Sequence, residues 1–233
     1  LYKRRRSGAM NRCLLCFCLV LFFFSLLMTD FLFAQNSTSV AATNTSSPVI
    51  VVTASRQPKE INSVPNVVHR IGVGEKIEQE SIRTTPGIID GLPSVLFQKT
   101  SYGQGSPFLR GFTGFRTLFL IDGIKLNNSV FREGPNQYWN TVDQYSISTG
   151  ELVMGAGSVL YGSDAVGGTF NVLSLVPSFP SEVPSWNSKL HYRYSTAEDS
   201  NIGRIQAGLS PLKELSFIGG VTVKDFGDLE GGK

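Results

Sequence analysis

The sequence contains 233 residues, of which 41% are hydrophobic and 17% are charged, with a formal net charge of +3. This balance excludes an intrinsically disordered protein and allows one domain of ordinary size with a smaller part beside it. Five cations and one anion lie in residues 1–34, so this segment carries a charge of +4 and the rest of the chain −1. The rest therefore has no basic excess that would attract nucleic acid.

Residues 1–34 have the pattern of an export signal. A basic run at 3–6 precedes an apolar stretch at 13–28, whose single hydroxyl side chain is a serine. This stretch is short for a membrane-spanning helix, which needs ~20 residues. We expect a secretory signal peptide cleaved after Ala34, with a retained membrane anchor as the alternative. Residues 1–9 then fit upstream read-through.

Candidate metal ligands are scarce outside that segment. All three cysteines, at positions 13, 16 and 18, lie inside it, so we expect neither a thiolate metal site nor a disulfide in the exported chain. His69 and His191 have no partners at metal-ligand spacing. The glycine-rich stretch from Gly155 matches neither a dinucleotide-binding nor a phosphate-binding loop. The residues thus predict no metal or cofactor.

A polar linker at residues 35–48 precedes a β-branched segment at residues 49–56. The linker consists of small polar residues without periodicity, which cannot bury enough apolar surface to order themselves. The run from Ile50 to Ala54 favours an extended strand, and Pro58 stops it. An ordinary edge strand of the next domain is the alternative to a tethered, exposed strand.

Residues 57–176 are predicted to form an α+β domain with a small mixed sheet and short helices. Thr85-Pro86 predicts a helix start, because threonine can accept from the first free amides and proline loses no hydrogen bond there. Asp122-Gly123 lies between apolar runs and predicts a tight hairpin, whose two central residues take positive φ. We further expect strands near 67–71, 95–97 and 169–173 and helical turns near 75–81.

Residues 177–186 are a stiff linker with three prolines, and the pattern changes after it. Apolar and polar residues alternate through residues 187–233, as at Leu190, Tyr192 and Tyr194, with turns expected at 197–201 and 210–214. This repeat is typical of membrane-barrel strands, although soluble hairpins can share it.

Four segments in order resemble the plug domain of TonB-dependent outer-membrane receptors. They are Val51–Ala54, Arg110–Phe112, Leu120–Gly123 and Gly157–Gly168, and the resemblance extends from about Val49 to Leu175. It implies an α+β plug domain followed by the first antiparallel strands of a transmembrane β-barrel. Because residues 187–233 supply only about four strands of barrel length, we expect an incomplete barrel and a truncated or partial chain.

The resemblance also implies a function. Such receptors lie in the outer membrane of bacteria, contact its lipid, and import a scarce nutrient, usually an iron–siderophore complex, haem or cobalamin. TonB, an inner-membrane partner, supplies the energy, and the protein is not an enzyme. The alternatives from the residues alone are a soluble secreted β-rich binding module and a non-functional truncated fragment. A signalling receptor is disfavoured, because residues 35–48 cannot hold a further domain.

Site residues follow from the resemblance as expectations. The TonB box, which binds TonB, is expected at Ile50, Val51, Val52, Thr53 and Ala54. Arg110 and Arg116 are expected to contact barrel carboxylates, with local pairing of Arg110 to Glu133 or Asp122 as the alternative. Substrate-facing loops are expected to present Tyr102, Phe131, Arg132 and Tyr138. Met154 departs from the family pattern, which usually has an arginine there.

Overall fold

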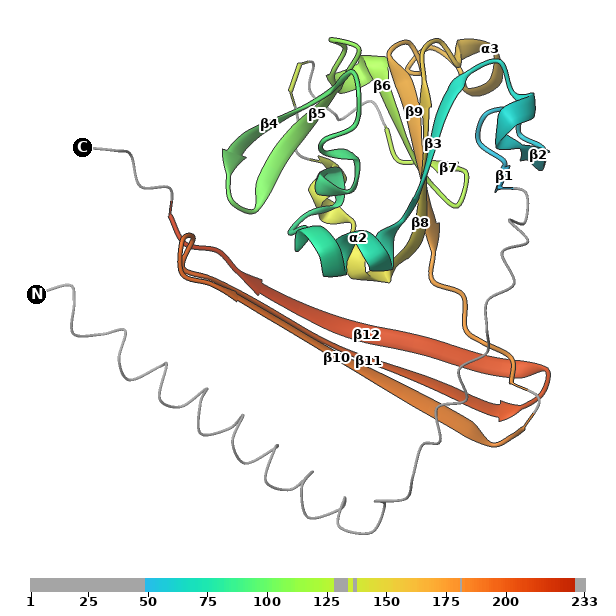
Figure 1. The fold of residues 1–233 in the computed structure, drawn as a ribbon, viewed down its shortest axis with the longest axis vertical. Helices are drawn as coiled ribbons and strands as arrows, with labels where there is room; N and C mark the ends of the chain where they lie inside the picture. The colour runs from blue at the N-terminus through green and yellow to red at the C-terminus, as the bar shows by residue number, and fades with distance from the viewer. Residues whose placement is uncertain (1–48, 128–133, 136–137, 181, 229–233) are drawn as a thin grey trace, which may run out of the picture. The chain divides into compact units, whose positions relative to one another are not determined.

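The computed structural model describes residues 49–127, 134–135, 138–180 and 182–228 (Figure 1). These residues belong to one unit, Ser47–Lys233. The predicted signal peptide, the polar linker and the loop residues Phe131 and Arg132 lie outside the described residues. Within those ranges, every helix is too short or too polar to cross a membrane.

A five-stranded mixed sheet forms the centre of residues 57–176, the α+β domain that resembles a receptor plug and is called the plug for that reason. Its strand order is β3-β8-β9-β6-β7, and only the β6–β9 pair is parallel. The strands are β3 (Val67–Gly72), β6 (Thr117–Ile121), β7 (Ile124–Lys125), β8 (Ile147–Met154) and β9 (Gly168–Ser174). The small mixed sheet expected from the sequence is therefore present (Figure 1).

The two faces of this sheet bury different residues, because successive side chains of a strand point to opposite sides. One face carries the main core, in which the Phe119 ring stacks on Trp139 with centroids 4.6 Å apart and Phe170 lies 5.5 Å from Trp139. Each such fully buried phenylalanine contributes about 1.5–3 kcal/mol. The other face carries a smaller cluster of Leu118 and Leu120.

Short helices cover the main core. The α-helix α2 (Val73–Glu80) buries Val73 and Ile77. The predicted helix at Thr85 is a 3-10 helix, η2 (Thr85–Ile89), whose buried Ile88 and Ile89 join the core. The expected side-chain cap is wrong, because the Thr85 hydroxyl donates to the Val142 carbonyl instead. The remaining short helices are η1 (Ile61–Ser63), η3 (Gly114–Arg116), η4 (Tyr138–Thr141), η5 (Gln144–Ser146) and α3 (Ser158–Tyr161).

Hairpins connect several of the strands. Strands β4 (Val95–Ser101) and β5 (Gln104–Leu109) form a separate two-stranded sheet. Between β6 and β7, Asp122 has φ 50° and Gly123 has φ 82°, as the Asp-Gly pair predicted. The Asp122 carboxylate accepts hydrogen bonds from the Ser174 amide and hydroxyl at 2.8 and 2.6 Å, so β9 holds the turn in place.

Three long antiparallel strands follow the plug: β10 (Ser185–Ser195), β11 (Ser200–Leu212) and β12 (Leu215–Asp225). They begin two residues earlier than expected, and the second turn is narrower, since β11 continues through a register shift between Leu209 and Leu212. The predicted alternation is present. The strand register places the exposed apolar side chains on one face of the sheet, and they include Leu190, Tyr192, Tyr194, Ile205, Leu209, Phe217, Val221 and Val223.

Candidate functional site

The segment Ile50–Ala54 is docked on the plug rather than free. Strand β1 (Ile50–Val51) pairs antiparallel with β2 (Lys59–Glu60). Val51, Thr53 and Ala54 are buried, whereas Ile50 is 51% exposed. The sequence favoured an exposed, tethered strand. The structure differs because Val51 and Thr53 are buried against the sheet face that carries the smaller cluster of Leu118 and Leu120.

Glu151 on β8 holds this segment. Its carboxylate accepts hydrogen bonds from the Val52 amide at 3.1 Å, the Thr53 amide at 2.9 Å and the Thr53 hydroxyl. Asn171 donates to the Thr53 hydroxyl oxygen at 3.1 Å, and the Tyr161 hydroxyl donates to the Thr53 carbonyl at 2.8 Å. The three donors to Glu151 all reach one carboxylate oxygen, Oε2, and such hydrogen bonds offset the cost of burying a carboxylate.

Tyr161 is suited to act as a hydrogen-bond donor here. Burial raises the pKa of its hydroxyl above the usual value, Arg56 lowers it, and Glu151 raises it further. The Arg56 guanidinium lies 5.1 Å from the centre of the Tyr161 ring. The hydroxyl therefore keeps its proton at neutral pH and remains available to the Thr53 carbonyl.

Arg110 and Arg116 are both exposed and lie near the glycine-rich segment that follows β8. Arg110 has a positive φ of 52°, and its amide donates to the Ser94 carbonyl at 2.9 Å. The Arg116 carbonyl accepts from the Gly167 amide at 2.8 Å. Neither guanidinium forms an ion pair with another described residue, and Asp122, one alternative partner, is bound to Ser174 instead. Glu133, the other alternative, lies outside the described residues.

The contact between the plug and the first long strands uses charges that the sequence reasoning missed. Asp143, just before η5, accepts from Arg204 Nη1 at 2.8 Å and the Thr222 hydroxyl at 2.8 Å, and lies 3.0 Å from Lys224 Nζ. The Arg204 side chain is only 7% exposed. This contact could have been suspected from Arg204 and Lys224, two cations at polar positions of the alternating pattern in β11 and β12.

A second ion cluster lies where β10 turns into β11. Glu198 pairs with Arg83 of the plug and lies 3.7 Å from Arg193 of β10. The described contacts thus run in both directions, with plug and strand each supplying cations and carboxylates. Arg110 and Arg116, the sequence candidates for this role, take no part in them.

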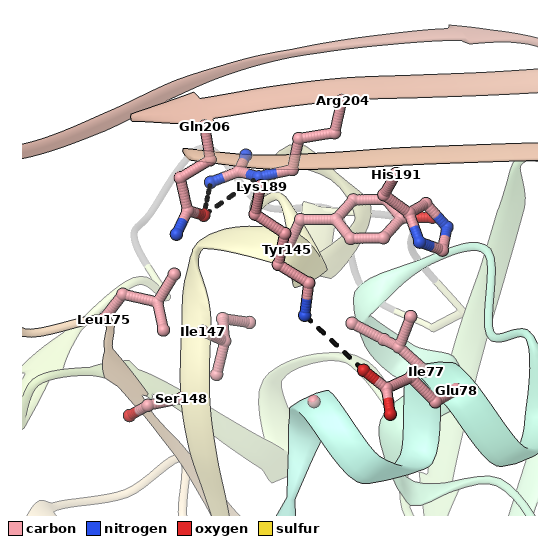
Figure 2. A pocket seen from close by; sticks show the side chains of 11 residues that line it. Ile77, Glu78, Tyr145, Ile147, Ser148, Leu175, Lys189, His191, Arg204 and Gln206 are labelled. Atoms are coloured by element: carbon pink, nitrogen blue, oxygen red, sulfur yellow. Dashed lines mark hydrogen bonds and ion pairs between the residues drawn. The ribbon is translucent and has the colours of Figure 1, made fainter. Parts of the chain in front are cut away.

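A cavity of about 260 Å³ lies between α2, the start of β8 and strands β10 and β11. Figure 2 shows the Tyr145 and His191 rings facing each other, with centroids 4.7 Å apart, and Lys189 reaching Glu78 at 3.5 Å. Lys189 pairs with Glu78, and Arg204 bonds Gln206. Among the described residues, the buried Tyr145 hydroxyl and His191 Nε2 have no hydrogen-bond partner.

The predicted substrate-facing residues are only partly described. Tyr102, in the β4–β5 turn, is half-buried, with its ring 6.0 Å from the Arg83 guanidinium. Tyr138 begins η4 and is also half-buried. Asn140 of η4 donates to the Gly105 carbonyl at 2.9 Å, which brings η4 beside β5.

Comparison with known families identifies this architecture. Residues 60–169 match the family described as the TonB-dependent Receptor Plug Domain. The chain carries a TonB-dependent receptor plug. The resemblance inferred from the four motifs is therefore confirmed, and so is the fold, an α+β plug domain followed by antiparallel strands that begin the barrel.

Relatives of known name share this region. A vitamin B12 transporter BtuB of Photobacterium profundum is 31% identical over 137 residues, covering 58% of this chain and 22% of that protein. BtuB of Vibrio vulnificus (strain YJ016) is 32% identical over 129 residues, covering 54% and 20%. This chain thus spans about a fifth of the length of these curated relatives.

Solved structures show the same fold. FpvA of P. aeruginosa, bound to heterologous pyoverdine, has a TM-score of 0.62 at 16% identity and covers 76% of this chain and 22% of that chain. The alcaligin outer-membrane receptor FauA of Bordetella pertussis has a TM-score of 0.56 at 16% identity, covering 74% and 29%. These likenesses concern the plug and the strands that follow it.

Proposed function

We propose that this chain is the N-terminal part of an outer-membrane transporter that takes up a scarce nutrient actively. The plug gates the barrel and couples it to TonB. The observation that carries this proposal is the order of parts: the docked β-branched segment at Ile50–Ala54, the plug match at residues 60–169, and the strands β10–β12. In this proposal the chain is part of a transporter and not an enzyme.

The surface of β10–β12 supports a place in a membrane. Large apolar side chains on one face of this sheet are exposed, for example Leu190 at 69% and Val221 at 70%. Such a face suits lipid, because membrane strands alternate apolar and polar residues between lipid and lumen. Arg204 and Lys224, on the opposite parity, contact the plug instead.

The substrate class follows from the relatives. The two relatives described above are vitamin B12 transporters, and the structural neighbours include receptors for pyoverdine and alcaligin. We therefore propose cobalamin or an iron chelate, either a siderophore or haem, as the substrate. In this proposal the outward loops that carry Tyr102, Phe131, Arg132 and Tyr138 contact it.

The coupling role falls to Ile50–Ala54. An extended β-branched segment can join a partner's sheet as an added strand, because its main-chain groups supply the hydrogen bonds. We propose that these residues form the TonB box, and that Arg110 and Arg116 pair with carboxylates of the barrel.

The test is uptake by the complete receptor. Cells lacking their own receptors would express it with and without TonB, and accumulation of labelled cyanocobalamin, haem and ferric siderophores would be measured side by side. We expect TonB-dependent accumulation of one of these compounds. If none accumulates although the receptor is present in the outer membrane, the proposed function is wrong.

A further inference from the structure

Glu151 is a buried carboxylate that serves neither the main core nor the contact with β10–β12. It is 2% exposed and lies on β8, a central strand of the five-stranded sheet. Its neighbour Leu152 faces the main core, so Glu151 faces the opposite side. Its cross-strand neighbours are Asn171 of β9 and Arg70 of β3.

All the polar groups of Thr53 are bound on this face. The amide and hydroxyl donate to Glu151, Asn171 donates to the hydroxyl oxygen, and Tyr161 donates to the carbonyl. By comparison, the β1–β2 ladder joins only two residue pairs. Hydrogen bonds to an ionised carboxylate are about twice as strong as neutral ones. The docking of this segment therefore depends chiefly on one side chain, with two supporting it.

We infer that Glu151, supported by Asn171 and Tyr161, is the latch that holds Ile50–Ala54 on the plug. The amides of Val52 and Thr53 that Glu151 binds are main-chain groups that a partner strand would also need. The latched state and full pairing of these residues with a partner strand therefore exclude each other, and the latch must open first. This inference rests on the proposed coupling role of the segment.

The test measures how often the segment leaves the plug. Ala54, 9% exposed, is replaced by cysteine in a complete receptor whose other cysteines are serine. The rate of maleimide labelling at position 54 is then measured in outer membranes from cells without TonB. We expect Glu151→Ala to raise this rate at least about tenfold, because three hydrogen bonds to a charged group are lost.

Two further variants remove only part of the hydrogen bonding between Glu151 and Thr53. Glu151→Gln keeps one acceptor oxygen of similar reach, so its labelling rate should lie between those of the parent and Glu151→Ala. Thr53→Val removes the hydroxyl from the segment and leaves Glu151 in place, and should also raise the rate. If Glu151→Ala does not accumulate, these two variants decide the outcome.

Met154→Ala is the matched control for general loosening of the sheet. Met154 lies on the same strand, is 3% exposed and packs in the main core. The inference is overturned if Met154→Ala raises the labelling rate as much as the Glu151 variants, or if neither Glu151→Gln nor Thr53→Val changes it. Labelling needs neither TonB nor substrate, so it is scored independently of the uptake assay that tests the proposed function.

Discussion

Asp143 is the residue on which the contact between the plug and the first long strands depends most. Its carboxylate is 26% exposed and binds Arg204, Thr222 and Lys224. Arg204 cannot lose its charge, so the loss of this carboxylate leaves an ionised group buried and unpaired. The loss of the Asp143 carboxylate therefore destabilises the contact between the plug and the strands.

Asp143→Ala is therefore expected to weaken this contact by about 2 kcal/mol, less than the roughly 3–5 kcal/mol of a fully buried pair because the carboxylate is partly exposed. Hydrogen exchange of plug amides in the complete receptor would report the free energy of opening. Asp143→Asn, which keeps an acceptor but loses the charge, should show a smaller effect. Equal exchange in Asp143→Ala and the parent would mean that these charges do not stabilise the contact.

Arg110 poses the opposite case, since its guanidinium is exposed and unpaired among the described residues. If it pairs with a barrel carboxylate, Arg110→Ala should loosen the plug in the complete receptor and admit large antibiotics. Antibiotic sensitivity, measured at matched receptor abundance, checks this. Unchanged sensitivity would favour a local role for Arg110, such as holding its left-handed turn, where φ is 52°.

These residues also show what the sequence could reveal. Asp122-Gly123 predicted its own turn, because the positive φ at both positions is a local property. Asp143 and Arg204 are 61 positions apart, and no local pattern joins them. Their pairing is visible only when the strands have a register. The same is true of Glu151 and Thr53, which are 98 positions apart.

Among the elements, the β6–β7 hairpin and the loop after α3 are joined by an ion pair between Lys125 and Asp164, 2.8 Å apart. Burial raises the pKa of Asp164, but hydrogen bonds and charge from Lys125, with Ser163 and Asn127, outweigh it and lower the pKa below its usual value. A carboxylate with a depressed folded pKa stabilises the fold above its unfolded pKa of 3.8, and this stability is lost as pH falls through the folded value.

Lys125→Met should accordingly lower stability at pH 7 by about 0.5 kcal/mol, since the lysine is partly exposed and solvent screens the pair. The difference from the parent should shrink below about pH 4, as Asp164 becomes protonated in both proteins. Urea unfolding at pH 7 and at pH 3 measures both differences. A pH-independent difference would assign the effect to lost packing of the lysine stem.

For the docked segment Ile50–Ala54, the sequence predicted the extended conformation but not the burial of its side chains. Its β-branched run predicted a strand, and β1 is present. Burial of Val51 and Thr53 depends on Glu151 and Asn171, which the chain supplies about a hundred positions later. The alternative of an edge strand thus describes the docked state, and the coupling role that we propose would require the released state.

Val51→Pro in the complete receptor tests that role. Proline removes an amide donor and fixes φ near −65°, so a strand added to TonB would lose a ladder bond and its register. We expect energised accumulation to fall sharply while cell-surface binding of the ligand is unchanged. Val49→Pro, just before the strand, is the control and should behave as the parent. Parental accumulation in Val51→Pro would restore the edge-strand interpretation.

In the molecule as a whole, the plug and the long strands place their apolar residues differently. The plug buries its apolar residues in two clusters, whereas β10–β12 expose large apolar side chains on one face of their sheet. The alternation in the sequence predicted this difference, because a period of two assigns each residue to a face before any contact is known. The alternation does not predict which part of the plug each of these strands contacts.

The 233-residue polypeptide expressed by itself should not form a channel. Among the described residues, the sheet β10-β11-β12 has two outer strands whose free edges carry unpaired amides and carbonyls. An unsatisfied backbone group in hydrocarbon costs several kcal/mol, so an open sheet cannot span a bilayer. We expect the purified polypeptide to give no ion conductance in planar bilayers, and the plug, residues 49–176, to fold as a soluble or aggregation-prone domain. The complete receptor, reconstituted in parallel, shows that the bilayer accepts a closed barrel. Stable conductance steps from the polypeptide alone would mean that its strands close with those of other copies, and the argument from free edges would fail.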